Sequence, residues 1–499
     1  MASSPTYLMF VGGEYVPAAS GKTFPVENPA TEEVIAEVSE GDAIDVDRAV
    51  AAAARAFERW GSTSGAARAR VLNRVGVLLA ERLPDLVSVE VDQTGRPLRE
   101  MKAQLARLPE WYEYFAAVAR TDEASVPPFG GPYLNYTRRV PLGVVGQLTP
   151  WNHPLLILTK KVAPALAAGN TLVVKPSELA PLTPLMLGDI LQAAGLPEGA
   201  YNVVPGFGAT AGLALASHPG IAKIDLTGGT ETGKAVASIA GKNLTRVAAE
   251  LGGKAPVIVF DDVDLERAVS GTLFASFIAA GQTCVQGALL LAHRSIHDAF
   301  VERLVERANK IVIGNPRDLK TEMGPLVSTR QLETVERYVA LGREAGARVV
   351  AGGRRPTGPG FERGYFYTPT VFTEVTIDMR VAQEEIFGPV VCVLPFETEE
   401  EAIRLANGTP FGLAGSIWTR DVRRAHRLVQ RLKIGIIWIN DHHRIDPASP
   451  WGGFKESGIG RENGLVAYHD YTQLQSIIVN LSEEPLDWYG GEAEGKRYS

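Results

Sequence analysis

The chain contains little cysteine. Cys284 and Cys392 are the only two among 499 residues, which excludes a disulfide-stapled scaffold and a zinc site with four thiolate ligands. An excess of charge of one sign is also missing, because the formal net charge is only −7. Such a chain has no overall attraction for nucleic acid or for an anionic membrane, and we expect neither as a partner. Each cysteine is therefore either part of a core or a reactive thiol.

Long hydrophobic runs are scarce as well. Residues 268–292 carry no charge, and a membrane-spanning helix needs about 20 apolar residues. However, Gln282, Thr283 and Gln286 interrupt this segment, so we expect it to be buried inside a soluble protein. The first residues lack a basic segment followed by an apolar core, so they predict no secretory signal. We therefore expect a cytoplasmic protein.

The remaining composition is that of a globular protein, with 45% hydrophobic and 21% charged residues. The length predicts more than one structural unit. From about Val140, short apolar segments alternate with helical patterns; these segments are VVGQLT, TLVVK, YNVVP, IAKIDLT and PVIVF. Strands that alternate with helices pair in parallel through crossover connections. The sequence therefore predicts a doubly wound α/β domain, and a second α/β pattern begins near Pro256.

Several other elements are also predicted. Residues 10–29 indicate β-hairpins, and apolar residues at helical spacing predict helices over 46–60 and after a Ser64 cap. Residues 421–433 form a basic segment with one apolar stripe, which is typical of a solvated helix packed on a core rather than of a nucleic-acid site. Residues 434–440 and 473–480 have the composition of strands.

Two glycine-rich loops are candidate phosphate sites. Gly206, Gly208 and Gly212 form GxGxxxG, which is one residue longer than the dinucleotide fingerprint and equally consistent with a plain turn. Residues 228–234 follow a predicted strand and read GxxxxGK, as in nucleotide hydrolases. Ala235 stands where that chemistry needs a hydroxyl for magnesium, so ATP turnover is the test of this alternative. Residues 228–234 still predict a glycine-lined helix N-terminus, which is suited to bind a pyrophosphate.

A thiol, a carboxylate and a side-chain amide are predicted on separate loops. Cys284 follows a helical pattern at 265–279, Glu250 precedes a strand, and Asn152 follows one. Each has an ordinary alternative: an inert buried cysteine, an exposed acid and a turn-forming amide. Together they supply the groups needed to oxidise a carbonyl through a covalent thioester.

Seven motifs carry a resemblance to a known family. TPWNHP, VKPSE, GGTETG, ELGGK, GQTC, EEIFGP and PWGGFKESGIGRE occur in this order, and the chain resembles the NAD(P)-dependent aldehyde dehydrogenase superfamily over residues 8–480. The resemblance implies an α/β fold with a Rossmann-like cofactor domain (1–121 and 142–252), an α/β catalytic domain (253–453) and a small β oligomerisation arm (122–141 and 471–481). It also implies a homodimer or homotetramer, with residues 122–141 expected to form a hairpin.

The resemblance assigns roles to individual residues. Cys284 is the expected nucleophile, the Asn152 amide and the Cys284 backbone N–H stabilise the oxyanion, Glu250 activates water, and Lys161 lies near Glu250. NAD is the expected cofactor, because the Glu178 carboxylate disfavours the 2′-phosphate of NADP; dual use stays open. The implied cofactor-binding residues are Thr149, Trp151, Lys175, Glu178, Gly208, Gly229, Thr230, Gly233, Leu251, Glu385 and Phe387.

The chain departs from the family pattern at two places. The arginine usual after the nucleophile is replaced by Leu289, which puts a local ion pair in doubt. Lys160 occupies a position that is often aromatic, beside a pocket to which Trp451 also contributes. We hypothesise that Lys160 and Arg444 bind a carboxylate or another polar group of a semialdehyde or polar aldehyde; the alternative is that both face solvent.

Two other functions and a metal site are alternatives for this sequence. A CoA-acylating semialdehyde dehydrogenase would transfer the acyl group to CoA, but the presence of Glu250 favours hydrolysis. A non-catalytic protein on the same fold is disfavoured by the joint presence of Cys284, Glu250 and Asn152. Asp441, His442 and His443 lack a further spaced ligand group, so no metal site is assigned.

Overall fold

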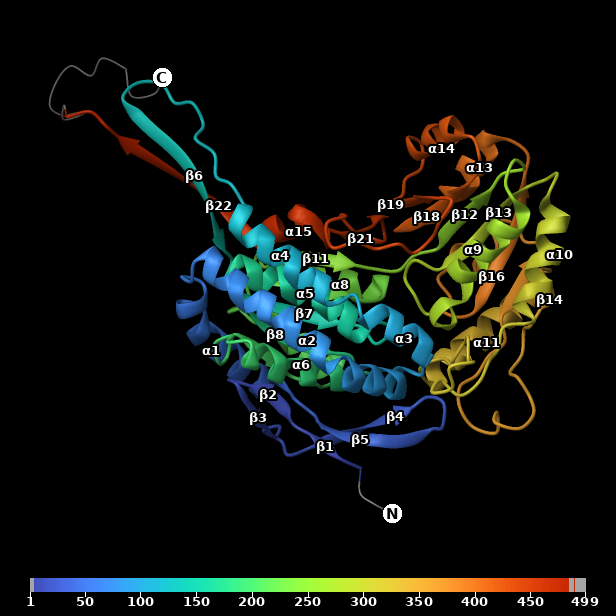
Figure 1. Cartoon of the computed structure of the whole chain (residues 1–499), viewed down its shortest axis with the longest axis horizontal. Coiled ribbons are helices and arrows are strands. Elements are labelled where there is room, and N and C mark those ends of the chain that lie inside the picture. The colour runs from blue at the N-terminus through green and yellow to red at the C-terminus, as the bar shows by residue number, and fades with distance from the viewer. Residues whose placement is uncertain (1–3, 484–488, 490–499) are drawn as a thin grey trace.

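The protein consists of two α/β units that lie side by side and an arm that projects from one of them (Figure 1). The computed structural model describes residues 4–483 and residue 489. The first unit is built on a sheet whose strands, in spatial order, are β21 (Gly458–Ile459), β11 (Arg246–Glu250), β10 (Lys223–Thr227), β7 (Val144–Thr149), β8 (Thr171–Pro176), β9 (Tyr201–Val203), β2 (Met9–Val11) and β3 (Glu14–Val16).

The five central strands of this sheet, β11, β10, β7, β8 and β9, are parallel. The chain starts in the middle at β7, proceeds through β8 and β9 on one side, and then crosses to β10 and β11 on the other. Lys223 of β10 lies opposite Val145 of β7, and Leu226 lies opposite Leu148. Since open α/β sheets bind ligands where the strand order reverses, the loops after β7 and β10 mark the expected site.

Helices cover both faces of the sheet. Val144 packs into one apolar cluster and Val145 into another, because alternate residues of a strand point to opposite faces. The first cluster includes α1 (Ala43–Trp60), α7 (Leu213–Ser217) and α8 (Thr230–Gly241). The second includes α2 (Gly65–Thr94), α3 (Leu98–Leu105), α4 (Pro109–Thr121), α5 (Pro154–Ala168), α6 (Leu182–Ala193) and α15 (Gly464–Asp470).

The second unit repeats this plan. Its sheet has the order β14 (Arg348–Ala351), β15 (Thr370–Thr373), β16 (Val390–Phe396), β13 (Gly287–His293), β12 (Ala255–Val259), β18 (Ala414–Trp418) and β19 (Ile436–Ile439). All neighbours are parallel except β14 and β15. Its helices are α9 (Leu265–Phe277), the short turn η2 (Ile278–Gly281), α10 (His297–Ala308), α11 (Thr329–Glu344), α12 (Arg380–Gln383), α13 (Glu399–Ala406) and α14 (Val422–Val429).

The projecting arm consists of β6 (Tyr133–Pro141) and β22 (Thr472–Asn480), paired antiparallel. The expected hairpin within residues 122–141 is wrong, because β6 finds its strand partner near the other end of the sequence. The first limb of that segment forms no strand among the described residues; its contacts include the hydrogen bond from the Thr137 backbone N–H to the Ser125 carbonyl at 2.8 Å and the pairing of Asp122 with His469 at 2.8 Å. The remaining strands form a sheet of β1 (Thr6–Tyr7), β5 (Glu33–Ser39) and β4 (Thr23–Asn28), and a pair of β17 (Phe411–Gly412) and β20 (Phe454–Lys455).

The uncharged stretch 268–292 is divided among α9, η2 and β13. Across the part of the chain that the structure describes, no helix is both long and apolar enough to cross a membrane.

The helix after Ser64 is confirmed, with the Ser64 side chain accepting from the Ala67 backbone N–H. The helix expected over 421–433 ends earlier, at Val429. The connection to β19 begins there. Leu432, the last apolar residue of the stripe, therefore lies in a loop, and its side chain is still buried.

Candidate active site

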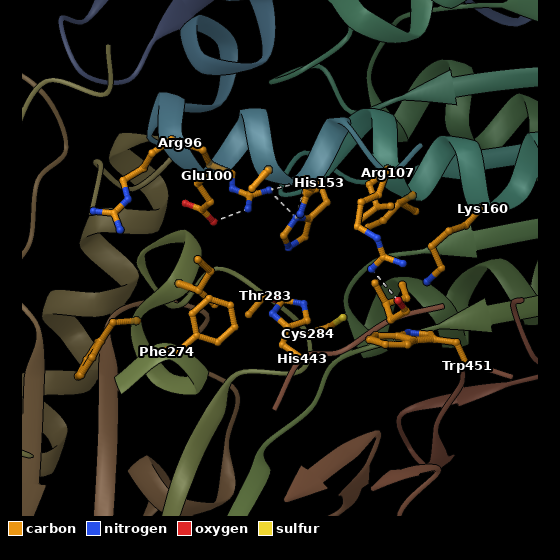
Figure 2. A pocket seen from close by; sticks show the side chains of 18 of the residues that line it. Arg96, Glu100, Arg107, His153, Lys160, Phe274, Thr283, Cys284, His443 and Trp451 are labelled. Carbon is orange, nitrogen blue, oxygen red and sulfur yellow. Dashed lines mark hydrogen bonds and ion pairs between the residues drawn. The ribbon is translucent and has the colours of Figure 1, made fainter. Parts of the chain in front are cut away.

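A cavity of about 790 Å³ is lined by residues from both units. Glu250 ends β11 of the first unit, whereas Cys284 lies in the loop between η2 and β13 of the second. Both side chains line the cavity, as do Lys160 from α5 and Trp451. The residues drawn in Figure 2 converge on this space from opposite sides.

The loop that presents Cys284 has an unusual backbone. Ala279 and Ala280 have φ of 55° and 54°, and Gly281 follows with φ of 72°. Left-handed conformations cost non-glycine residues about 1 kcal/mol or more each, so surrounding contacts must hold them. One contact is the Ala279 backbone N–H, which donates to the Glu100 carboxylate at 3.1 Å. On the other side, a Cβ on Gly253 would lie 2.4 Å from the Cys284 carbonyl oxygen, so the ELGGK segment approaches the Cys284 loop closely.

The thiol of Cys284 is in an environment that favours its neutral form. Burial raises its pKa to about 12; the Lys160 ammonium opposes this shift, and the carboxylates of Glu250, Glu385 and Glu462 add to it. A thiolate is the nucleophilic form. In the described structure the thiol is therefore largely protonated at neutral pH.

The side chain of Asn152 is tied to the same loop. Asn152 follows β7, is 5% exposed and donates from Nδ2 to the Gln282 carbonyl at 3.0 Å. An amide nitrogen carries two hydrogens, so one remains for another acceptor. Asn152 itself is not among the residues that line the cavity.

Glu250 is a buried acid without a hydrogen-bond partner for either carboxylate oxygen among the residues described. Burial raises its pKa well above the usual value, Glu462 adds to this effect, and Lys160 and Lys161 oppose it. A carboxylate whose pKa is shifted toward neutrality and whose oxygens face a cavity is suited to accept a proton from water.

Beside Glu250 lies a compact cluster of four buried charges. Glu462 binds Lys160 at 2.5 Å and Lys161 at 2.6 Å, and Lys161 also pairs with Asp225. Burial alone would raise the pKa of Glu462, but the two ammonium groups lower it to about 2. Burial would lower the pKa of Lys161, but Asp225 and Glu462 raise it. Lys161 is therefore a fixed cation near Glu250.

The residues predicted to bind the substrate differ in whether they line the cavity. Lys160 lines the cavity, and its ammonium lies 4.5 Å from the centre of the Trp451 ring. The Arg444 side chain is 80% exposed, pairs with Asp441 at 3.0 Å and is not among the cavity-lining residues. For Arg444 the structure therefore matches the solvent-facing alternative.

The predicted phosphate loop begins α8. Gly229 caps this helix, and a Cβ at Gly229 would meet no atom within 4 Å. At Gly233 a Cβ would lie 2.5 Å from a methyl group of Leu251, so the helix packs closely against the ELGGK segment. Lys234 pairs with Glu231 and Glu456 at 3.0 and 3.2 Å, which leaves it poorly placed for the phosphate role of a nucleotide hydrolase.

The other predicted cofactor residues lie at the ends of β7 and β8 and across the interface. Lys175 pairs with Glu178 at 3.2 Å, and Thr149 has a buried hydroxyl without a partner among the described residues. The Trp151 and Phe387 rings meet edge to face at 5.3 Å. Glu385 accepts from the Gly253 backbone N–H at 2.9 Å, and burial raises its pKa to about 7. Gly208 begins a single turn of π-helix, Gly208–Gly212.

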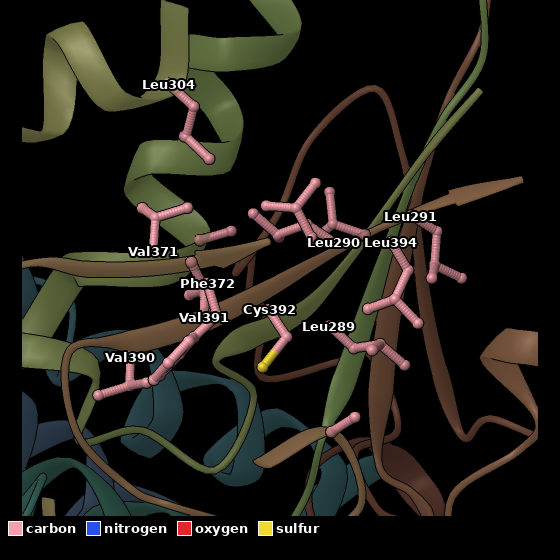
Figure 3. Packing of buried hydrophobic residues seen from close by; sticks show 14 of the residues in the cluster. Leu289, Leu290, Leu291, Leu304, Val371, Phe372, Val390, Val391, Cys392 and Leu394 are labelled. Atoms are coloured by element: carbon pink, nitrogen blue, oxygen red, sulfur yellow. The ribbon is translucent and has the colours of Figure 1, made fainter. Parts of the chain in front are cut away.

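Leu289 lies in the core of the second unit. It is fully buried on β13 and faces Cys392 of β16 across the sheet, among other apolar side chains (Figure 3). An arginine at this position would bring an unpaired charge into that cluster. Cys392 is fully buried there, so it is the structural cysteine of the two.

Sequence reasoning missed a set of buried polar residues. Glu462 stands inside a quoted motif, but its charge pairs depend on residues far away in the sequence. Arg96 is 4% exposed and joins Glu100, Gln104, the Asn152 carbonyl and the His153 ring. Its position between Gly95 and Pro97, at the end of α2, is the one local signal for a special role.

A thiol on a strained loop, a buried acid and an amide lie where a doubly wound sheet meets a second α/β unit, and such an arrangement is typical of an enzyme active site. The comparisons identify the class of enzyme. The model of the aldehyde dehydrogenase family matches residues 15–477. The chain is 42% identical to a betaine aldehyde dehydrogenase of Bacillus subtilis over 486 residues, covering 96% of this chain and 99% of that protein.

Solved structures give the same result. The fold matches a betaine aldehyde dehydrogenase of Staphylococcus aureus in complex with NAD+, with a TM-score of 0.95, 39% identity and 97% of both chains covered. It also matches an NAD+ complex of an aldehyde dehydrogenase from Bacillus cereus, with a TM-score of 0.93, 42% identity, and 96% of this chain and 97% of that chain covered. The chain belongs to the aldehyde dehydrogenase family and is an oxidoreductase.

Proposed function

We propose that this enzyme oxidises an aldehyde to the carboxylic acid with NAD, through a thioester on Cys284 that is hydrolysed by water activated by Glu250. The observation that carries the proposal is the pair of groups in one cavity: a cysteine on a strained loop, and a buried acid whose two oxygens have no hydrogen-bond partner among the described residues.

The residues predicted for the cofactor fit a dinucleotide. The N-terminus of α8 offers unpaired backbone N–H groups and open space beside Gly229, which suit a pyrophosphate. Glu178 and Lys175 can hydrogen-bond ribose hydroxyls, and the Glu178 carboxylate would repel an added phosphate. NAD, when bound, supplies the acceptor for the hydride. The NAD+ complexes of the two solved relatives support this assignment.

In the first step the Cys284 sulfur attacks the aldehyde carbon. The second Nδ2 hydrogen of Asn152 and the Cys284 backbone N–H stabilise the oxygen that becomes negative, and one such donor is typically worth about 3–4 kcal/mol. Lys160 lowers the pKa of the thiol and so favours the attacking form. After hydride loss, the acyl group is bonded to sulfur.

In the second step Glu250 takes a proton from water, and the hydroxide attacks the thioester and releases the acid and the thiol. Its burial makes it a stronger base than an exposed carboxylate, and Lys161 favours the charged form.

Pre-steady-state kinetics of Glu250→Gln tests whether Glu250 acts only in the second step. We expect a burst of about one NADH per active site, followed by steady turnover reduced roughly 10²–10⁴-fold, because only the water step needs the base. Cys284→Ala is the control and should give no burst. A Glu250→Gln variant with wild-type turnover would contradict the proposal.

The same experiment addresses the CoA-acylating alternative. CoA added to the wild type should leave the product a free acid. A several-fold rise in turnover with formation of an acyl-CoA would favour the alternative instead.

For the substrate, we propose a polar or acidic aldehyde rather than a cationic one. The ring face of Trp451 that could hold a cation is occupied by the chain's own Lys160. A quaternary ammonium aldehyde, such as the betaine aldehyde named for the relatives, would meet this ammonium. Two of the three hydrogens on Lys160 remain beyond the one directed to Glu462.

Comparing kcat/KM for three aldehydes tests this: betaine aldehyde, its neutral isostere 3,3-dimethylbutanal, and a semialdehyde of similar length. We expect the semialdehyde to be favoured over betaine aldehyde by about tenfold or more, and Lys160→Ala to remove that preference selectively. Equal loss on all three substrates would overturn the role of Lys160.

We also propose that the β6–β22 arm assembles the enzyme into a homodimer or homotetramer. Its support is a set of exposed apolar side chains on a two-stranded ribbon that extends away from the body; these are Tyr133, Leu134, Tyr136, Leu474, Ile478 and Val479.

A further inference from the structure

One buried polar atom in the cavity is not used by the proposed mechanism. His153 lies between Asn152 and α5, is 4% exposed and lines the cavity. Its Nε2 atom is buried and has no hydrogen-bond partner among the residues described. Figure 2 shows the ring directed into the cavity, with His443 facing it; the two ring centres are 6.1 Å apart.

The neighbours of His153 fix which nitrogen carries the proton. Nδ1 contacts Nη1 of Arg96, and a guanidinium can only donate. Nδ1 therefore has a bare lone pair, and the proton of the neutral ring is on Nε2. Gln104 is compatible with this tautomer, because its Oε1 accepts from Arg96 at 3.0 Å and its Nε2 lies 3.1 Å from Nδ1 and can donate to it; the contact between Nδ1 and Oε1 is longer, at 3.3 Å.

The charged form of this ring is disfavoured. Burial lowers the pKa of His153 well below its usual value, and the nearby Arg96, His443 and Lys160 lower it further. The ring is therefore neutral at physiological pH, and Nε2–H is a permanent donor directed into the cavity.

Apolar side chains contribute much of the cavity wall, alongside charged residues and His443. Leu156 and Ile157 come from the same helix as Lys160, and Phe274, Phe277 and Ile445 line the cavity from elsewhere. A buried donor without a partner is costly, and the apolar side chains offer it nothing to bond. A ligand atom is the partner that would restore the lost hydrogen bond.

We propose that the Nε2–H of His153 is a specificity determinant that binds an oxygen acceptor on the aldehyde substrate, in a group separated from the aldehyde carbon by an apolar segment. The acceptor class comprises hydroxyl, ether, ketone and carboxylate oxygens. This inference rests on the proposed oxidation of an aldehyde in the same cavity. It adds a second recognition point to the one proposed at Lys160.

The test compares matched pairs of aldehydes that differ only in the acceptor. Suitable pairs are ω-hydroxyalkanals against methyl-terminated alkanals of equal length, and hydroxybenzaldehydes against methylbenzaldehydes. Each pair gives a ratio of kcat/KM, measured by NADH formation. For the wild type, at least one pair should favour the acceptor by about tenfold, since a site that bonds a substrate oxygen rejects the analogue that leaves its donor unpaired.

Two substitutions separate the donor from the shape of the ring. His153→Phe keeps a planar ring but removes the donor, and we expect its ratio to fall to about one. His153→Gln places an amide N–H near the former Nε2 position, and we expect it to keep a ratio of at least a few-fold. Arg444→Ala, on the exposed side chain outside the cavity, is the control and should keep the wild-type ratio.

Either of two results would overturn the inference: no pair with a wild-type ratio above about three, or a wild-type ratio retained in His153→Phe. Failure of the proposed function is a different outcome, because then no aldehyde of either kind would yield NADH. Activity of the wild type on the methyl-terminated aldehydes distinguishes the two.

Discussion

At the scale of single residues, the protonation of Cys284 controls reactivity. Its pKa, raised to about 12 by burial and by nearby carboxylates, lies far above neutral pH. Below that value the thiolate fraction grows about tenfold for each pH unit.

Alkylation of the cofactor-free enzyme by iodoacetamide should therefore accelerate about tenfold per pH unit from pH 7 to pH 10 without a plateau. Mass spectrometry of the labelled peptide measures the rate for this cysteine alone. Cys392, buried in the core and also with a raised pKa of about 11, should label far more slowly. A plateau at pH 8 or below would contradict the expected protonation state.

Single residues also mark the limit of what the sequence could predict. Cys284 and Glu250 were found because they lie in motifs, and Lys160 was found because it departs from the family pattern; the structure places all three on one cavity. Arg96 and His153 were missed, because their importance comes from contacts between α2, α3 and the loop before α5. Arg444 stands next in sequence to a cavity residue, His443, but the chain turns there and directs Arg444 to solvent.

At the scale of elements, α8 packs closely against the segment after β11, near the predicted cofactor loop. Both methyl groups of Leu251 lie within 2.7 Å of the position that a Cβ on Gly233 would occupy. Leu251 is buried, so it has little room to move.

We expect Gly233→Ala to shift the start of α8 and to raise the KM for NAD by about tenfold, since overpacking of this kind costs typically 1–3 kcal/mol. Isothermal calorimetry with NAD measures the change in affinity directly. Gly241→Ala is the matched control: it lies in the same helix with nothing within 4 Å of the added methyl group. It should leave NAD affinity unchanged and stabilise the helix slightly. Equal affinity in both variants would argue against a role for this contact.

Strands β7, β8, β9 and β10 of the first sheet and β12 and β19 of the second were predicted, because each is a short apolar run. Strand β11 of the first sheet and the other five strands of the second were not predicted. The pairing of these strands could not be predicted in the same way. Strand β6 pairs with β22, which the chain reaches only after it has passed through the second unit. The local sequence of residues 122–141 therefore cannot predict this partner.

At the scale of the whole molecule, the arm is the feature that extends furthest from the body (Figure 1). One of its faces carries Leu134 and Val479 as a cross-strand pair, with Tyr136 beside them. Apolar pairs on a ribbon are expected to lie against another surface.

We expect Val479→Asp to shift the protein toward smaller species in light scattering, because it places a charge in the centre of this pair. Val422→Asp is the matched control, because Val422 is an exposed valine at the start of α14, outside the arm. An unchanged mass for Val479→Asp at micromolar concentration would count against assembly through this face.

The long return of the chain also has a consequence for biosynthesis. β6 emerges early from the ribosome, but its partner β22 is made close to the end, and β21, which closes one edge of the first sheet, is made only shortly before. Until then a nascent chain exposes the unpaired strand β6 with its apolar side chains, and such strands associate with other chains. Polypeptides that end before β22 should therefore aggregate or bind chaperones, even though nearly all strands of both sheets are present in them.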